Sequence, residues 1–140
     1  MEQLKLDNQL CFPFYTVSRL IIRKYKPHLD ELGITYAQYL VLLVLWETDH
    51  QPVNDIAKRL YLQTNTITPL LQRLEALGIV KRSKDEHDER RVIIGLTDYG
   101  SDMKNKAAQI PFKLLEGAEI DINELAVLKN QLDKLIERLA

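Results

Sequence analysis

Apolar residues recur at steps of three and four along most of the chain, which is the spacing of helices. Through roughly residues 6–32 the stripe consists of Cys11, Phe14, Ser18, Ile22, Tyr25 and Leu29. Because an interior proline removes a backbone hydrogen bond, we expect this helix to bend or break near Pro13 or Pro27. The next helix opens on Thr35-Tyr36-Ala37-Gln38, a capping-box pattern, and its apolar run predicts that it is buried.

Two shorter helices and a hairpin are expected next. The stretch PVNDIAKRLYL predicts a helix with Asn54 as its N-cap, and TNTITPLLQRLEALG predicts one capped by Thr64 or Asn65. Gly78 suits the left-handed residue after a helix end. Runs rich in β-branched residues at 79–84 and 91–97 flank the charged hexapeptide DEHDER, a pattern typical of a β-hairpin with an exposed tip.

The C-terminal part again reads as helix. Thr97 is placed to cap a helix from residue 98 to about 116, kinked near Pro111, and Asp121 begins another. That last helix has a narrow seam of leucines: Leu125, Leu128, Leu132, Leu135 and Leu139. Such a seam either packs on a second chain, as in a coiled coil, or folds back on its own core. The fold class is therefore mainly α with a small β-hairpin.

Composition limits the protein class only broadly. A chain of 140 residues, 46% hydrophobic and 28% charged, is ordinary for one soluble domain. It has no apolar run of membrane-spanning length and no signal-peptide layout, so we expect no membrane partner and a cytoplasmic location. The single cysteine also fits a reducing compartment. The net charge of −1 does not indicate whether the protein binds nucleic acid. The segment from Asn54 to Arg91, however, contains eight basic and six acidic residues and is therefore locally positive.

Two short helices followed by a hairpin have the order of a winged helix-turn-helix, whose second helix reads the major groove with its N-terminal residues. The corresponding side chains hydrogen-bond without charge, as base-edge contacts require, and Arg73 follows one turn on. They are Thr64, Asn65, Thr66, Thr68 and Gln72. The alternative is that the basic residues of this region only keep an amphipathic surface solvated.

The stretch from Thr64 to Gly100, with LLQRLEALG, Asp88-x-Arg90 and a closing LTDYG, resembles the recognition helix and wing of the MarR family of bacterial transcription regulators. The resemblance covers essentially the whole chain. It implies one domain, residues 1–140, in which 1–34 and 98–140 form a helical dimerisation region and 35–97 the winged module. It also implies a homodimer on a palindromic operator, with Arg82, Asp88 and Arg90 serving the wing. Asp88 would brace Arg90, which would enter the minor groove.

Within that family, QLCF followed by KYKPHLDELGITYAQYLVLLVLW is similar to the organic-hydroperoxide regulators (OhrR) and to related thiol-based global regulators. The resemblance implies that Cys11 is a peroxide sensor held by Tyr25 and Tyr36 of the other subunit. On a continuous helix, Cys11 and Tyr25 would lie about 21 Å apart, so any contact between them has to cross a dimer axis. Aromatic neighbours such as Phe12 would favour organic hydroperoxides over hydrogen peroxide.

The expected chemistry follows from the single thiol. The thiolate is the nucleophile, and a helix N-terminus with phenol donors would stabilise it. Its oxidation gives a sulfenic acid. Since no second cysteine exists, the next product is a mixed disulfide with a small thiol, or an over-oxidised sulfur. We therefore expect a repressor that releases its operator when Cys11 is oxidised.

Other interpretations stay open. Cys11 is a simple space-filling residue if the regulator instead responds to a phenolic or lipophilic ligand in its dimer cleft. A one-cysteine peroxidase would need a motif such as Thr-x-x-Cys, which is absent, and an inert scaffold would not bind duplex DNA. His28, His50 and His87 are too scattered to predict a metal site. We expect no enzyme activity, catalytic residue, metal or cofactor. The remaining tyrosines are expected to be packing residues: Tyr15, Tyr39, Tyr61 and Tyr99.

Overall fold

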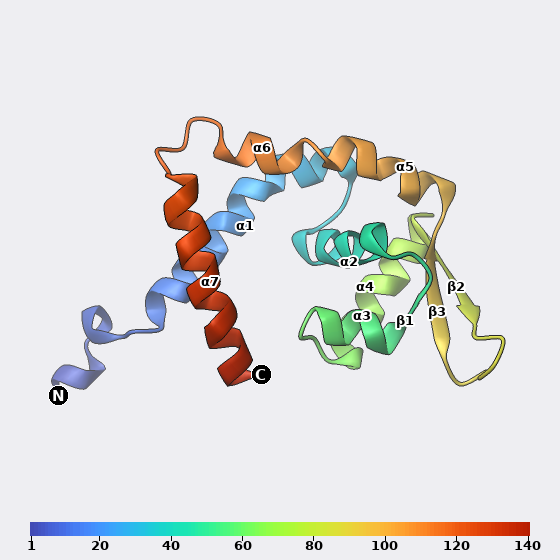
Figure 1. Cartoon of the computed structure of the whole chain (residues 1–140), viewed down its shortest axis with the longest axis horizontal. Helices are drawn as coiled ribbons and strands as arrows, with labels where there is room; N and C mark the ends of the chain where they lie inside the picture. Colours follow the sequence, from blue (N-terminus) through green and yellow to red (C-terminus); the bar gives the residue numbers. More distant parts are fainter.

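Seven α-helices and three short strands make up the chain in the computed structural model, which describes residues 1–140 (Figure 1). Two 3-10 turns, Glu2–Leu4 and Leu6–Asn8, come first. The helices are α1 (Phe12–Leu32), α2 (Tyr36–Glu47), α3 (Val53–Arg59), α4 (Thr64–Ala76), α5 (Asp98–Ala107), α6 (Ile110–Leu115) and α7 (Ile122–Leu139). The strands are β1 (Gln51–Pro52), β2 (Val80–Lys84) and β3 (Val92–Leu96). The predicted fold class, a mainly helical winged helix-turn-helix, is confirmed.

Helix α1 differs from the expected bent helix. It begins at Phe12, with Cys11 as its N-cap and Pro13 in the first turn, where a missing N–H costs nothing. It then continues through Pro27 without a break and ends at Gly33, whose φ of 71° is left-handed. The burial of Leu29, which is 2% exposed, anchors this end of α1 to the core. The segment expected to be helical from residue 6 is therefore broken next to Pro13, as predicted, whereas no break occurs at Pro27 and α1 is one continuous element from Phe12.

Helix α2 is the centre of the core, as its apolar run predicted. The capping box is present: the Thr35 hydroxyl accepts a hydrogen bond from the Gln38 backbone N–H (3.3 Å), and Gln38 Oε1 accepts one from the Thr35 N–H (2.9 Å). Around α2 the buried side chains come from the end of α1 and from α3, α4, the hairpin and α5. This core fixes the start of α2, where Tyr36 lies.

The winged module consists of α3, α4 and a sheet in the order β1-β3-β2, all antiparallel. The hairpin was predicted, but β1 was not, because a two-residue strand containing a proline has no periodicity. Two expected caps are also wrong: the N-caps of α3 and α4 are Pro52 and Gln63, neither of which caps with its side chain. The Asn54 side chain instead accepts a hydrogen bond from Thr64.

Beyond the hairpin, Thr97 caps α5 as expected, accepting a hydrogen bond from the Gly100 N–H at 3.1 Å. The predicted kink is a full break at residues 108–109, with Pro111 in the first turn of α6. No single helix has the length and apolar composition to cross a membrane; α1 and α2 meet those criteria only as a pair bent by 70°.

Helix α7 lies across α1 in Figure 1 and buries none of its residues. Between the two helices runs a groove of about 370 Å³ whose walls include Phe14, Leu128 and Leu135. The N-terminal half of α1 also exposes large apolar side chains, among them Val17 and Ile21. A single chain therefore leaves a wide apolar surface open on α1 and α7, which is typical of an interface with another protein.

Candidate functional site

The lone thiol and the phenols expected to hold it are apart within one chain. Cys11 is a free, exposed thiol at the start of α1. Tyr25 lies on the same unbroken helix, so about 21 Å of helix axis separates the two residues. The structure brings Tyr25 and Tyr36 together, with ring centroids 4.9 Å apart, and leaves Cys11 away from Tyr25.

These two tyrosines belong to a cluster that α2 builds against α1. The Tyr39 ring lies 5.7 Å from that of Tyr25 and 6.2 Å from that of Tyr36, and the Trp46 ring contacts Tyr39 edge-on at 6.3 Å. Tyr39 is 3% exposed, as expected of a packing residue. Tyr39 was not predicted to lie beside Tyr25 and Tyr36, the two residues predicted to support the sensor, although the Tyr36-x-x-Tyr39 spacing puts Tyr36 and Tyr39 on one helix face. By contrast, Tyr15, Tyr61 and Tyr99 are exposed in the single chain, so they do not pack in its core as expected, and packing of Tyr15 against a second copy stays a prediction.

Burial controls the ionisation of the cluster. It raises the pKa of Tyr25 to about 12, with smaller contributions from the neighbouring phenols of Tyr36 and Tyr39. Burial also raises the pKa of Tyr36 and of Tyr39 above the ordinary value. All three hydroxyls are therefore protonated at neutral pH and available as hydrogen-bond donors.

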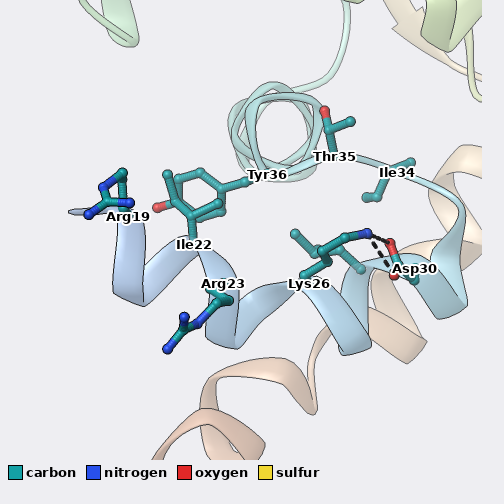
Figure 2. Close-up of a pocket in the computed structure, with 9 residues that line it drawn as sticks. Arg19, Ile22, Arg23, Lys26, Asp30, Ile34, Thr35 and Tyr36 are labelled. Carbon is teal, nitrogen blue, oxygen red and sulfur yellow. Dashed lines mark hydrogen bonds and ion pairs between the residues drawn. The ribbon is translucent and has the colours of Figure 1, made fainter. Parts of the chain in front are cut away.

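A cavity of about 500 Å³ opens beside this cluster, between α1 and the start of α2 (Figure 2). Ile22, Leu29 and Ile34 supply its apolar wall. Its rim is basic because Arg19, Arg23 and Lys26 come from successive turns of α1, and Lys26 already binds Asp30 at 3.0 Å. Figure 2 shows the hydroxyl of Tyr36 at the Arg19 end of the cavity. The phenol is thus directed into an open, partly apolar site.

The residues expected to read DNA lie at the start and along the outer side of α4. Thr64, Asn65, Thr66, Gln72 and Arg73 are exposed and Thr68 is half-buried. The Thr68 hydroxyl donates to the Thr64 carbonyl oxygen at 2.8 Å, and the Thr64 hydroxyl donates to Asn54 Oδ1 at 3.3 Å. Both hydroxyl protons are satisfied within the protein, so these side chains present acceptor oxygens to the outside.

On the wing, Asp88 holds Arg90 in place. Asp88 Oδ1 accepts hydrogen bonds from the Arg90 backbone N–H (3.0 Å) and from Arg90 Nε (3.2 Å), while the Arg90 side chain is 92% exposed. Arg82 and Arg90 line a common cleft with Asn54 and Arg91, two residues that sequence reasoning missed. No sequence signal marks Asn54 or Arg91, because the cleft forms only when the hairpin folds onto α3 and α4. No group of three His, Cys, Asp or Glu side chains is close enough to hold a metal ion.

Known proteins are similar to this chain along nearly its whole length. Residues 23–107 match the family model described as the transcriptional regulator SarA/Rot. The organic hydroperoxide resistance transcriptional regulator of Bacillus subtilis (strain 168) is 44% identical over 138 residues, covering 99% of this chain and 94% of that protein. The chain belongs to the MarR family, in its OhrR-like branch. This regulator also resembles two solved structures, reduced AbfR bound to DNA (TM-score 0.82, 41% identity) and overoxidised AbfR bound to DNA (TM-score 0.80, 40% identity).

Coverage in both structural matches is 99% of this regulator, and 96% and 98% of the respective AbfR chains. The resemblance stated from the QLCF and LTDYG segments is therefore confirmed. The relatives are transcriptional regulators, which are not enzymes. The roles of the individual residues in this regulator stay predictions.

Proposed function

We propose that two copies of this chain form a repressor that binds a palindromic operator and releases it when an organic hydroperoxide oxidises Cys11. Two findings on relatives support this function. One relative is named for organic hydroperoxide resistance, which supports the oxidant. AbfR has been solved on DNA in both a reduced and an overoxidised form, which supports DNA binding by a redox-active regulator, so we assign release to the sulfenic acid and its mixed disulfide rather than to the overoxidised sulfur. We place the regulator in the cytoplasm, where the thiol stays reduced and the DNA is accessible.

One observation carries the proposal: α1 is unbroken, so the thiol at its start cannot contact the phenol of Tyr25 in the same chain. The Tyr36 hydroxyl faces an open cavity. Cys11 is a free, exposed thiol. If two α1 helices run antiparallel across a two-fold axis, the thiol of one copy meets the phenols of the other.

The exposed apolar surfaces support that second copy. Leucines at 125, 128, 135 and 139 of α7 are unburied in one chain, together with the N-terminal half of α1. We assign residues 1–34 and 98–140 to dimerisation and 35–97 to DNA binding. Burying this surface is favourable at about 25 cal/mol per Å² of apolar area.

The sensing reaction uses the thiolate of Cys11. Its sulfur attacks the outer oxygen of the hydroperoxide, a sulfur–oxygen bond forms, the O–O bond breaks, and the leaving alkoxide takes a proton to become an alcohol. Protonated phenols of Tyr25 and Tyr36 stabilise the thiolate by donating hydrogen bonds. The sulfenic acid then reacts with a small thiol, giving a mixed disulfide and water.

Oxidation changes the volume and polarity of the sulfur where the partner's phenols pack, and the α1 pair shifts. The two α4 helices then no longer keep the separation of one DNA turn, about 34 Å, that half-sites need. Thr64, Asn65, Thr66, Thr68, Gln72 and Arg73 would read the major groove, while Arg82 and Arg90, the latter braced by Asp88, would serve the wing.

The test compares wild type with Cys11→Ser on a duplex from the regulator's own promoter region. Both proteins should bind the duplex when reduced, because Cys11 lies outside the winged module. Cumene hydroperoxide should release wild type only, and mass spectrometry should find the added oxygen or thiol on Cys11. Release of Cys11→Ser by the same peroxide would contradict the sensor role, and failure of both proteins to bind any duplex would contradict the regulator itself.

A second candidate is favoured by the cavity of about 500 Å³ with an apolar wall and a basic rim. A phenolic or lipophilic ligand there would displace the DNA with Cys11 as a bystander. In that case a small aromatic acid releases Cys11→Ser as readily as wild type.

A thiol-based global regulator of the same subgroup is a further alternative. It would bind many promoters, and a genome-wide measurement of DNA occupancy would count them. Finally, we propose that the protein is not a peroxidase: in steady-state assays with a thiol donor, peroxide consumption should be no faster with the protein than with the same amount of Cys11→Ser.

A further inference from the structure

A small cleft lies where the base of the wing meets α3 and α4, outside the proposed redox site. Its volume is about 210 Å³, and its lining includes Asn54, Thr64, Thr68, Arg82, Arg90 and Arg91. No acidic residue lines the cleft. Three guanidinium groups and three neutral hydrogen-bonding side chains therefore meet in one hollow, which suits a compact anion.

The strand register explains why Arg82 points into this cleft. Arg82 pairs with Ile94 across the hairpin, and Val80 pairs with Leu96, so these four residues share one face of the sheet. The other three are buried against the helices, whereas Arg82 lies further out where the core has ended. No carboxylate lies within ion-pair distance of Arg82. Its charge is thus held at the helix-facing side of the wing without a protein partner.

The other side chains leave donors free as well. The hydroxyl of Thr64 uses Asn54 Oδ1, at 3.3 Å, which leaves the Asn54 amide N–H groups without a hydrogen-bond acceptor in the protein. One guanidinium nitrogen of Arg91 lies 3.7 Å from a carboxylate oxygen of Asp85. This long ion pair leaves the other N–H donors of the guanidinium available. Arg90 projects beyond the cleft and is held by Asp88.

We propose that this cleft seats a single phosphate group of the DNA backbone, bound by Arg82 and Arg91 from the wing and by Asn54 from the start of α3. The inference rests on the proposed DNA binding and deepens it. One phosphate bound from both sides would tie the wing to the helix pair, so that α4 and Arg90 enter adjacent grooves in a fixed relation. Asn54 and Arg91 are then positioning residues that read no base.

The test is the salt dependence of binding to a duplex of arbitrary sequence, compared for wild type and the double variant Arg82→Gln/Arg91→Gln, because one remaining arginine would still neutralise the shared phosphate. Each phosphate contact contributes about 0.9 to the slope of log affinity against log salt. A dimer that loses one contact per subunit should therefore have a slope shallower by about 1.8. Between 50 and 200 mM salt, such a variant should lose about 12-fold less affinity than wild type loses.

Arg59→Gln is the matched control, because it removes one charge from the same module at a residue that pairs with Glu47 and lies outside the cleft. If the slope of the Arg82→Gln/Arg91→Gln double variant equals that of Arg59→Gln, the cleft assignment is wrong while DNA binding stands. If wild type binds no duplex, the proposed function itself has failed. Asn54→Ala should weaken binding to all sequences equally; a change in sequence preference would contradict its positioning role.

Free phosphate is the other source of the same anion. Inorganic phosphate should produce no saturable shift of the Thr68 amide resonance below 10 mM, at constant ionic strength and without DNA. A saturable shift in that range would mean that the cleft takes a free phosphate ion, and it would overturn the assignment to DNA.

Discussion

Replacing Tyr25 with Phe removes the phenol hydroxyl and keeps the ring, so it tests the contribution of the hydroxyl alone. The ring packs 4.9 Å from Tyr36 and 5.7 Å from Tyr39, and Phe preserves that packing. With its pKa at about 12, the Tyr25 hydroxyl is a donor at pH 7. A hydrogen bond to a charged group contributes about 1.5–3 kcal/mol, so its loss lowers the thiolate population by about 10-fold to 150-fold. A less stabilised thiolate is also a better nucleophile, and this gain offsets about half of the logarithm of the fall in thiolate population. We expect oxidation to slow by about 3-fold to 12-fold.

The assay is sulfenic acid formation at pH 7 with excess cumene hydroperoxide, trapped with dimedone and followed by mass spectrometry. Tyr99→Phe is the control, since it removes the hydroxyl of an exposed tyrosine on α5. A Tyr25→Phe rate within twofold of the control at pH 7 would show that this hydroxyl does not contact the reacting sulfur.

Four further outcomes follow from the structure. Because burial raises the pKa of Tyr25 from 10 to about 12, folding favours its neutral form; wild type should lose stability as the pH rises from 10 to 12, and Tyr25→Phe should lose less in urea titrations. Thr35→Ala breaks the capping box and should lower the free energy of unfolding by about 1 kcal/mol in the same titration. Leu135→Lys places a charge on the open face of α7 and should shift sedimentation from dimer to monomer without loss of helical circular dichroism. Gly100→Ala brings a methyl group against the carbonyl oxygen of Ile79 and should cost about 1–3 kcal/mol, measured as a lower Tm.

Features fixed by local hydrogen bonding could be predicted from the sequence. The capping box of Thr35, the cap on Thr97, the left-handed Gly78 and the start of α7 at Asp121 all agree with the structure. Each depends on residues within four positions of one another, so the sequence contains the whole interaction.

Features that depend on distant partners could not. Strand β1 exists because Gln51 and Pro52 pair with Ile94 and Ile93, more than forty residues away. Asn54 does not cap α3 because its side chain binds Thr64 of the next helix. Pro27 does not interrupt α1, whose far end is anchored in the core by Leu29.

The candidate redox site likewise has one part that could be predicted from a single chain and one part that depends on a second copy. The residues were identified from the sequence, and the closeness of Tyr25 and Tyr36 follows from the packing of α2 on α1. The place of Cys11 is different, because its expected neighbours belong to a second copy and no contact within one chain specifies them. Family resemblance supplied that pairing, and the unbroken α1 makes a pairing within one chain impossible.

Each α1 helix of the proposed dimer carries the Cys11 thiol at its start and the Tyr25 phenol further along. The two redox sites of the dimer therefore depend on the same two helices. Each helix supplies the reactive atom of one site and the donors of the other. Damage at either sulfur would therefore move both helices, and the second site would no longer have its resting environment. Such a pair would respond to a single oxidation event, with one modified thiol sufficient to disturb both halves of the switch.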